Sequence, residues 1–320
     1  MHGPPTPSAS AENTISAARA SAVFLGVATA LTILAARTVD GGRCEDGSIS
    51  SLIWQPSMNT FRRFEGDSEP MYNFYTEVLG FEALDPYDVG NDTEVWRIQA
   101  GASQLKLSRR VEGKSYVDGG VPDATGLRLW TFFFSDEDAV SRRFADAGLP
   151  MPVFEDLCAH PAMKCKRSAL VSDPSGHDVE LVITGDAEGT EHEEMEVGVV
   201  VSDLDVGHQF YRGFLGLERV GSADDARFDT TKHVFRNGAT FVSLRSFGNH
   251  LPADTGSAGI QYVVTDAAAV EDLARDRGIT VDQGLSTIDG FTVRTVWLSD
   301  PDGITNYFAD TKESRGEVDT

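Results

Sequence analysis

Basic residues are scarce in this chain of 320 residues. Lys and Arg together number 27, with 6 Lys against 21 Arg, while Asp and Glu number 50, so the formal net charge is -23. Nucleic-acid binding depends on Lys and Arg side chains that neutralise phosphates, and anionic membrane surfaces attract the same residues. The composition therefore excludes nucleic acid as a partner and disfavours an anionic membrane surface.

Cysteine is also rare, with three residues, and an odd number argues against a full disulfide framework. Cys158 and Cys165 lie in one segment, EDLCAHPAMKCKR. They could close a small ring in an oxidising compartment, or remain ordinary thiols. With His160 they could also offer a C-x-H-x4-C set to a soft metal, although that spacing is not a standard zinc pattern. The sequence has no Gly-rich phosphate loop and no G-x-S-x-G motif.

An uncharged apolar run lies near the N-terminus, at residues 21–36 (SAVFLGVATALTILAA). It is shorter than the roughly 20 residues that a membrane-spanning helix usually needs, and it resembles the apolar core of an export signal. We therefore expect residues 1–50 to form a leader, either an export signal or an uncleaved membrane anchor, and the protein to be exported or membrane-anchored. The alternative is an Ala-rich leader without a function.

The rest of the sequence repeats itself. Residues 74–84 (FYTEVLGFEAL) match residues 210–220 (FYRGFLGLERV), and residues 172–182 (SDPSGHDVELV) match residues 299–309 (SDPDGITNYFA). A third match lies between these two in both copies. Three matches in the same order indicate a duplicated domain. The predicted boundaries are 55–184 for the first domain, 185–194 for an acidic linker, 195–311 for the second domain and 312–320 for a tail.

Each copy subdivides into two similar units. In the second copy, the valine-rich run at residues 196–201 is typical of a strand. Ser202 and Asp203 then cap a helix, Gly216 ends it, and strand-like runs follow. A second unit of the same kind begins at residues 260–264. The pattern predicts an α+β fold of four βαβββ units, two in each copy.

The two repeated phrases resemble a known family. F-Y-x-x-x-L-G-[FL] after a capped helix, with D-P-x-G-x-x-x-E on a later strand, resembles the vicinal oxygen chelate superfamily, which includes glyoxalase I, extradiol dioxygenases and bleomycin-resistance proteins. The resemblance covers about residues 58–310. It implies open bowls of paired βαβββ units, in which a divalent metal (Fe, Mn, Ni or Zn) polarises a small oxygenated substrate. The fold hosts many chemistries, so the reaction stays open.

The resemblance also implies metal ligands on the first strand of each unit, commonly His or Gln, and on the end strands, commonly Glu. Counting from the motifs places Glu180 in an end-strand position of the first copy and Glu196 in a first-strand position of the second. The other positions fall on residues that are not the usual ligands: Thr60, Leu129, Gly259 and Tyr307. Neither copy alone therefore holds the usual ligand set.

Glu180 and Glu196 could still share one bowl, because in some four-unit members unit two pairs with unit three. The two carboxylates could then hold a hard metal weakly, or act without metal as a general acid/base pair. Otherwise Glu180 is a relic of the family on a solvated strand, and Glu196 is an edge residue. We take Glu180 and Glu196 as the candidate catalytic and metal-binding residues.

Polar side chains on other bowl strands are candidate substrate contacts. Gln104 and Lys106 alternate on the run SQLKLS, and Arg245 lies on the matching run of the second copy. A cation on a concave sheet could hold a carboxylate or phenolate, although alternation also places polar residues on the wet face of a half-buried sheet. We add Gln261 and Tyr307, and expect an anionic or phenolic small molecule as partner.

Three functions are consistent with these residues. The first is an enzyme of the lyase, isomerase or dioxygenase type that acts on a small oxygenated molecule. The second is a metal-free protein that binds and sequesters a small molecule, like the bleomycin-resistance proteins, and the third is a scaffold that keeps only the fold. Glu180 and Glu196 favour the enzyme, whereas the missing His ligands argue against it. A homodimer is an assembly that we leave open.

Overall fold

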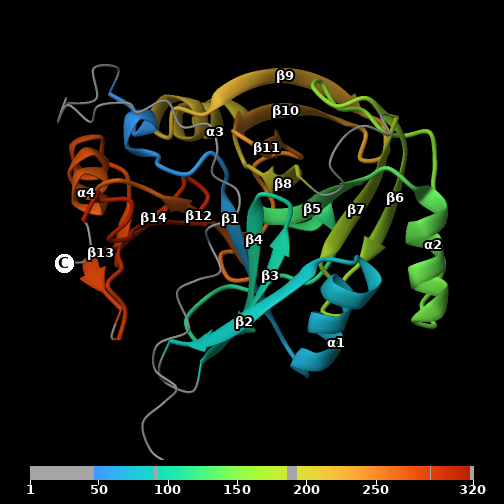
Figure 1. Ribbon diagram of the computed structural model, residues 1–320. Coiled ribbons are helices and arrows are strands. Elements are labelled where there is room, and N and C mark those ends of the chain that lie inside the picture. The colour runs from blue at the N-terminus through green and yellow to red at the C-terminus, as the bar shows by residue number, and fades with distance from the viewer. Residues whose placement is uncertain (1–46, 90–92, 186–192, 289, 318–320) are drawn as a thin grey trace, which may run out of the picture. The chain divides into compact units, whose positions relative to one another are not determined.

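The computed structural model describes residues 47–89, 93–185, 193–288 and 290–317 (Figure 1). These residues belong to one of the two units into which the chain divides, Cys44–Thr320. Most of the expected leader lies outside the described residues, as does most of the acidic linker. Within the described part of the chain, no helix is both long and apolar enough to cross a membrane.

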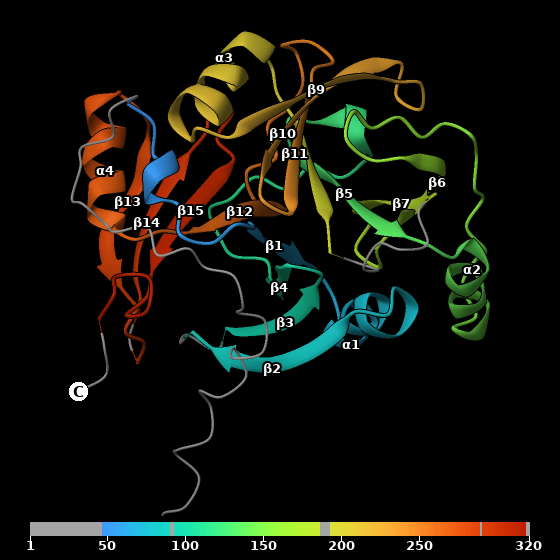
Figure 2. The ribbon, with the colours of Figure 1, turned by 45° about the horizontal axis from the view of Figure 1, so that its top comes forward.

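The strands form two curled sheets (Figures 1 and 2). The first contains β1 (Asn59–Phe64), β2 (Glu82–Asp88), β3 (Glu94–Ala100), β4 (Ser103–Arg109), β12 (Ala258–Val263), β13 (Val281–Thr287), β14 (Arg294–Ser299) and β15 (Thr305–Asp310), in the order β13-β14-β15-β12-β1-β4-β3-β2. The second contains β5 (Gly126–Phe134), β6 (Cys165–Ser172), β7 (Asp178–Thr184), β8 (Met195–Val200), β9 (Glu218–Asp225), β10 (Thr230–Asn237) and β11 (Thr240–Arg245), in the order β6-β7-β5-β8-β11-β10-β9.

The helices follow the first strand of each unit. They are α1 (Ser68–Asn73), which continues as a π-helical turn over Phe74–Val78, α2 (Glu137–Asp146), α3 (Leu204–His208), which continues in the same way over Gln209–Phe214, and α4 (Ala267–Asp276). The predicted α+β fold of βαβββ units is confirmed. In unit two, however, only β6 and β7 follow α2, and an irregular segment at residues 147–164 stands in place of the third strand.

The sheet order also shows how the units pair. Units one and four share the eight-stranded sheet, through the antiparallel pair β1–β12, and units two and three share the seven-stranded sheet, through β5–β8. Each sheet therefore combines strands from both copies. This is the pairing across the chain that brings Glu180 and Glu196 into one sheet.

A buried hydrogen bond joins the two repeated motifs within each copy. The Tyr75 hydroxyl donates to Asp173 Oδ2 at 3.1 Å, and the Tyr211 hydroxyl donates to Asp300 Oδ2 at 2.9 Å. The other oxygen of each Asp accepts backbone N–H bonds from the turn that follows it, as when His177 donates to Asp173 Oδ1 at 2.9 Å. The Tyr of one motif thus packs the helix of one unit against the turn of the next.

The two copies differ in how the buried Asp is balanced. Arg62 Nε donates to Asp173 Oδ2 at 3.2 Å, and both side chains are almost fully buried. Asp300 is also buried, but it forms no ion pair with a cation in the described part of the chain. Burial therefore raises the pKa of Asp300 to about 7.

This difference predicts different effects on stability for two matched variants. An unfolded Asp ionises near pH 3.8, whereas folded Asp300 stays protonated to about pH 7, so the wild-type chain loses stability as the pH rises between those values. Asp300→Asn cannot ionise. The difference in free energy of unfolding between this variant and wild type, measured by urea unfolding, should shift in favour of the variant by about 1–4 kcal/mol from pH 4 to pH 8.

Asp173→Asn is the control for this experiment. It leaves Arg62 buried without its carboxylate, so it should be destabilised by about 3–5 kcal/mol at pH 8. If the two Asn variants had the same effect on stability at pH 8, the contrast between the two buried carboxyls would be wrong.

Candidate functional site

Each sheet carries one row of four side chains at corresponding positions, across its two central strands and their two neighbours. In the eight-stranded sheet the row is Gln104, Asn59, Gln261 and Tyr307, and in the seven-stranded sheet it is Phe241, Glu196, Thr131 and Glu180. These are the positions for which the family resemblance implies metal ligands. Asn59 pairs with Gln261 across the first strands of units one and four, and Glu196 pairs with Thr131 in the same way. The first-strand positions are therefore Asn59, Thr131 and Gln261, and the prediction of Thr60, Leu129 and Gly259 was wrong. The connection from β1 to the Phe-Tyr motif is one residue longer than its counterpart after β8, which shifted the count at Thr60.

Four of the five predicted substrate contacts meet on the eight-stranded sheet. Lys106 Nζ donates to Gln261 Oε1 at 2.5 Å and lies 3.3 Å from the Tyr307 hydroxyl. Asn59 Nδ2 donates to the same Gln261 oxygen at 3.4 Å, and Asn59 Oδ1 accepts the backbone N–H of Gln104 at 2.9 Å. We call these five residues the Lys106 cluster.

Aromatic rings surround the Lys106 cluster. Trp297 on β14 stacks on Tyr307, with ring centroids 4.6 Å apart, and Phe61 on β1 lies 6.0 Å from the same Tyr. Tyr87, on the edge strand β2, contacts Phe291 in the β13–β14 connection at 5.7 Å. Because β2 and β13 are the two edges of this sheet, the contact shows that the sheet curls so that the β13–β14 connection reaches the opposite edge strand.

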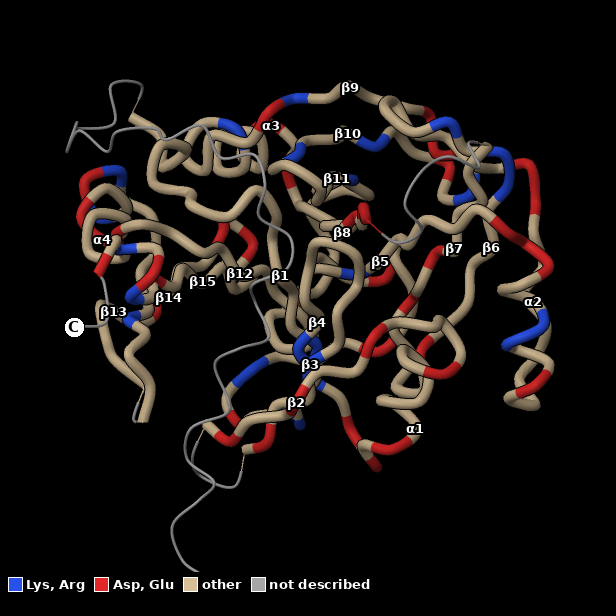
Figure 3. Tube along the Cα trace, in the orientation of Figure 1, with Lys and Arg blue, Asp and Glu red and all other residues tan. Residues whose placement is uncertain are grey.

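The environment of Lys106 lowers the pKa of its amine to about 7. Burial is the larger cause, because a charged amine loses hydration, and the positive charge of Arg97 on β3 is the second. Basic residues on β3 and β4 can be seen in blue in Figure 3. Near neutral pH this amine can therefore be either an ammonium group or a free base.

The corresponding face of the seven-stranded sheet is covered by the irregular segment of unit two. A disulfide joins Cys158 to Cys165, which supports the ring interpretation of this segment. Cys158, Met163 and Cys165 pack against a cluster of buried side chains, Phe133, Val182, Val234 and Phe241. The His160 ring inserts between Phe133 and Phe241, with centroids 5.7 and 4.7 Å away.

Glu196 lies beneath this segment and is fully buried. Its carboxylate lies 3.0 Å from His160 Nε2, 3.4 Å from Lys232 Nζ and 3.8 Å from a guanidinium nitrogen of Arg245. Burial raises the pKa of Glu196, but Lys232, His160 and Arg245 outweigh it and hold that pKa well below its usual range. Glu196 is thus an ionised carboxylate enclosed by its own partners.

Two other predicted site residues belong to this enclosed face. Arg245 is fully buried, where its Nε donates to Asp225 at 2.8 Å, so it does not join the Lys106 cluster. Glu180 accepts a hydrogen bond from Thr131 Oγ1 at 3.2 Å and lies 4.0 Å from Arg227. Glu180 and Glu196 flank Thr131 on the same sheet, but each is held by different partners. Their catalytic role stays a prediction.

The donor groups of the two faces do not fit a divalent metal. Amide, phenol and amine groups make up the Lys106 cluster, which offers no carboxylate or imidazole ligand. On the other face, the cations around Glu196 would repel a metal ion. Throughout the described residues, no three His, Cys, Asp or Glu side chains are grouped so that they could hold a metal. The chemistry of the Lys106 cluster is therefore that of its own amine, amide and phenol.

Two residues at this site were not predicted from the sequence, Asn59 within the Lys106 cluster and Arg97 beside it. Strand alternation in NTFRRF places Asn59 and Phe61 on one face and Thr60 and Arg62 on the other. The same alternation places Arg97 opposite Lys106, its partner in the β3–β4 pair. This alternation was the signal available in the sequence, but the strand positions were counted from a distant motif instead.

Comparison with known proteins agrees with this architecture. The Glyoxalase/Bleomycin resistance protein/Dioxygenase superfamily matches residues 57–181 and 195–308. The chain belongs to this superfamily. Glyoxalase I from Zea mays has 19% identity and a TM-score of 0.60, over 82% of this chain and 97% of that one. A putative dioxygenase from Bacillus subtilis has 13% identity and a TM-score of 0.55, over 84% and 91%.

These structural likenesses show the fold alone. A comparison with curated protein sequences gives no match. Within the superfamily, the predicted tandem arrangement is confirmed, because both copies match the family separately.

The enclosure of Glu196 predicts a structural cost for its removal. Glu196→Gln leaves Lys232 and Arg245 buried beside a neutral amide, so the free energy of unfolding should fall by about 3–5 kcal/mol. Glu180→Gln is the matched control, because an amide oxygen can still accept the Thr131 hydrogen bond, and its cost should stay near 1 kcal/mol. Urea unfolding of both variants measures the difference. Equal stabilities for the two variants would contradict the enclosed ion-pair network.

Proposed function

We propose that the protein binds a small planar anion, a carboxylate or a phenolate, on the inner face of the eight-stranded sheet, without a metal. The observation that carries this proposal is the position of Lys106. Its amine lies beside the row of residues for which the family resemblance implies metal ligands, and it contacts Gln261 and Tyr307. A cation there can meet the oxygen atom of a ligand as a metal would.

The walls of the site favour a flat ligand. Trp297, Tyr307 and Phe61 present ring faces and edges, and aromatic side chains bury large apolar areas against planar groups. Arg97 adds a second positive charge near the amine. In a chain with a net charge of -23, this local positive pair favours an anion over a neutral molecule.

A proton-transfer reaction of the lyase or isomerase type is the second candidate. A lysine whose pKa is about 7 matches the range in which a general base is effective near neutral pH. The neutral amine of Lys106 would take a proton from the carbon next to a substrate carbonyl and return it to the product. Tyr307 would donate a hydrogen bond to the enolate oxygen formed in between.

We also propose that the protein is exported or membrane-anchored. The disulfide between Cys158 and Cys165 supports this, because disulfides persist in oxidising compartments and are rare in the cytosol.

Binding can be tested with benzoate as the probe. Benzoate should bind one site per chain, measured by isothermal titration calorimetry at constant ionic strength, and benzamide should bind more weakly. Lys106→Met should weaken benzoate binding at least tenfold, because it removes the charge partner. Chelation of metals with EDTA should leave the affinity unchanged.

The benzoate titration is also repeated at several pH values and with a control variant of another lysine. Because the ammonium form of Lys106 exists below about pH 7, benzoate affinity should fall as the pH rises from 6 to 9. Lys166→Met removes an exposed lysine and should change nothing. Equal losses in the two Met variants, or binding that requires a metal, would refute the proposed site.

The enzymatic candidate has its own readout. In D2O the wild-type protein should exchange the methyl protons of pyruvate faster than buffer does, followed by proton NMR, and Lys106→Met should abolish the increase. Benzoate binding without proton exchange would leave the binding function and exclude this proton transfer for pyruvate.

A further inference from the structure

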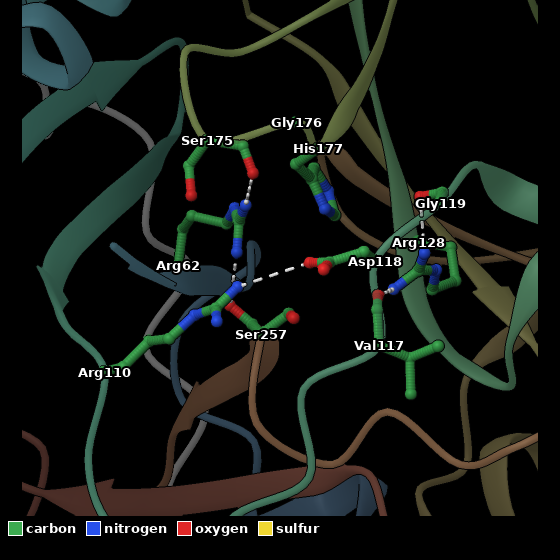
Figure 4. Close-up of a pocket in the computed structure, with 10 residues that line it drawn as sticks. All are labelled: Arg62, Arg110, Val117, Asp118, Gly119, Arg128, Ser175, Gly176, His177 and Ser257. Carbon is green, nitrogen blue, oxygen red and sulfur yellow. Dashed lines mark hydrogen bonds and ion pairs between the residues drawn. The ribbon is translucent and has the colours of Figure 1, made fainter. Parts of the chain in front are cut away.

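A cavity of about 210 Å³ lies away from the Lys106 cluster (Figure 4). It is lined by residues from β1, β5, the β6–β7 turn and the segments that follow β4 and precede β12. Arg62 follows Phe61 on β1, so its side chain leaves the face of the sheet opposite to the Lys106 cluster. The cavity volume is enough for a small solute.

Basic side chains dominate the lining of this cavity. Arg62, Arg110, Arg128 and His177 contribute to it, and Figure 4 shows the His177 ring pointing from its turn toward the space between Arg62 and Arg128. Arg128 is held in place by the Val117 and Gly119 carbonyl oxygens at 2.8 and 2.6 Å. The Arg128 guanidinium is therefore fixed before any ligand arrives.

Three buried nitrogen atoms of this lining lack a partner among the described residues. They are Nε2 of His177 and the Nε atoms of Arg128 and Arg110. His177 and Arg128 are each only 4% exposed. Buried donors without an acceptor are rare in native proteins, because each costs about 1–3 kcal/mol. An acceptor that enters the cavity would remove this cost.

Of the three arginines that line the cavity, only Arg110 is not paired with a buried carboxylate of the described part of the chain. Asp173 and Asp254 are buried and balance Arg62 and Arg128. Among the described residues, Arg110 forms ion pairs only with Glu65 and Asp118, whose side chains are 77% and 99% exposed, and its guanidinium lies 4.5 Å from the centre of the Tyr116 ring. Such surface pairs contribute little, so a ligand can replace them at small cost.

The second copy of the domain serves as an internal control. The positions that correspond to Arg62, Arg110 and His177 are occupied by Val199, Phe247 and Ile304, whereas Arg128 is an extra residue at a register shift in β5 and has no counterpart in β12. Two of these, Val199 and Ile304, are buried in the apolar core. The fold is therefore built with apolar residues at these positions, and the basic set belongs to the first copy alone.

We propose that this cavity binds a small oxyanion, a carboxylate or phosphate group, between Arg110, Arg128 and His177. The oxyanion would accept hydrogen bonds from the three unpartnered nitrogen atoms. Burial, and then the charges of Arg62 and Arg128, hold the pKa of His177 well below its usual range. Its neutral imidazole therefore acts as a hydrogen-bond donor, with the proton on Nε2 when an acceptor is present.

Inorganic phosphate and acetate are the probes for this site. Each is titrated into the full chain by isothermal titration calorimetry, with sodium chloride used to hold the ionic strength constant. Arg110→Gln removes the available guanidinium, and His177→Ile installs the residue of the second copy. Each variant should weaken the binding of the preferred oxyanion at least tenfold, or about 1.4 kcal/mol, while thermal unfolding shows that both variants remain folded.

Two controls separate this site from others. Arg109→Gln removes the exposed neighbour of Arg110 that does not line the cavity, and should leave binding unchanged. Lys106→Met should leave phosphate binding unchanged, so this site and the benzoate site can fail separately. Preference for phosphate or for acetate identifies the ligand class. Absence of saturable binding of both, or equal binding by wild type, Arg110→Gln and His177→Ile, would overturn the proposal.

Discussion

The hydrogen bond between a buried tyrosine and a buried aspartate is the constraint on which this architecture depends. Tyr75 and Asp173 form it in the first copy, and Tyr211 and Asp300 form it in the second. In each copy the Tyr follows the first strand of one unit and the Asp opens the final turn of the next. The bond therefore fixes two neighbouring units against each other while their strands belong to different sheets.

This arrangement leaves two inner sheet faces that have diverged. On the seven-stranded sheet, the segment closed by Cys158 and Cys165 covers the face, and His160 reaches Glu196. On the eight-stranded sheet, the stacked rings of Tyr307 and Trp297 lie beside a half-buried amine, Lys106. On the seven-stranded sheet the charged groups pair with one another. On the eight-stranded sheet a cation and polar groups lie beside aromatic side chains. The second is therefore the better candidate for a ligand.

Much of the fold could be predicted from the sequence, because the repeated motifs are the residues that make the buried contacts. The four-unit α+β organisation followed from them directly. Lys106, Gln261 and Tyr307 were predicted to line a bowl, and strand alternation was sufficient to bring them together. The role of Arg245 could not be read in this way, because alternation shows the face of a strand but not what covers it.

The differences between the two copies also cannot be predicted by counting residues from the repeated motifs. Arg62 pairs with Asp173, whereas Asp300 pairs with no cation among the described residues, and this difference changes the charge balance of two otherwise similar turns. Such differences depend on which strand lies next to the turn that contains the Asp. The pairing of units across the chain determines which strand that is. The sequence left this pairing open, and the strand register supplies it.

The most direct test of the central claim is the titration of Lys106 itself. Reductive methylation with ¹³C-formaldehyde labels the lysines while keeping their charge, and Lys106→Arg assigns the signal by NMR. The account predicts a pKa of about 7 for this amine in the free protein, and an upward shift when benzoate binds. A Lys106 signal that titrates near 10.4, as an exposed lysine does, and that benzoate leaves unchanged would contradict it.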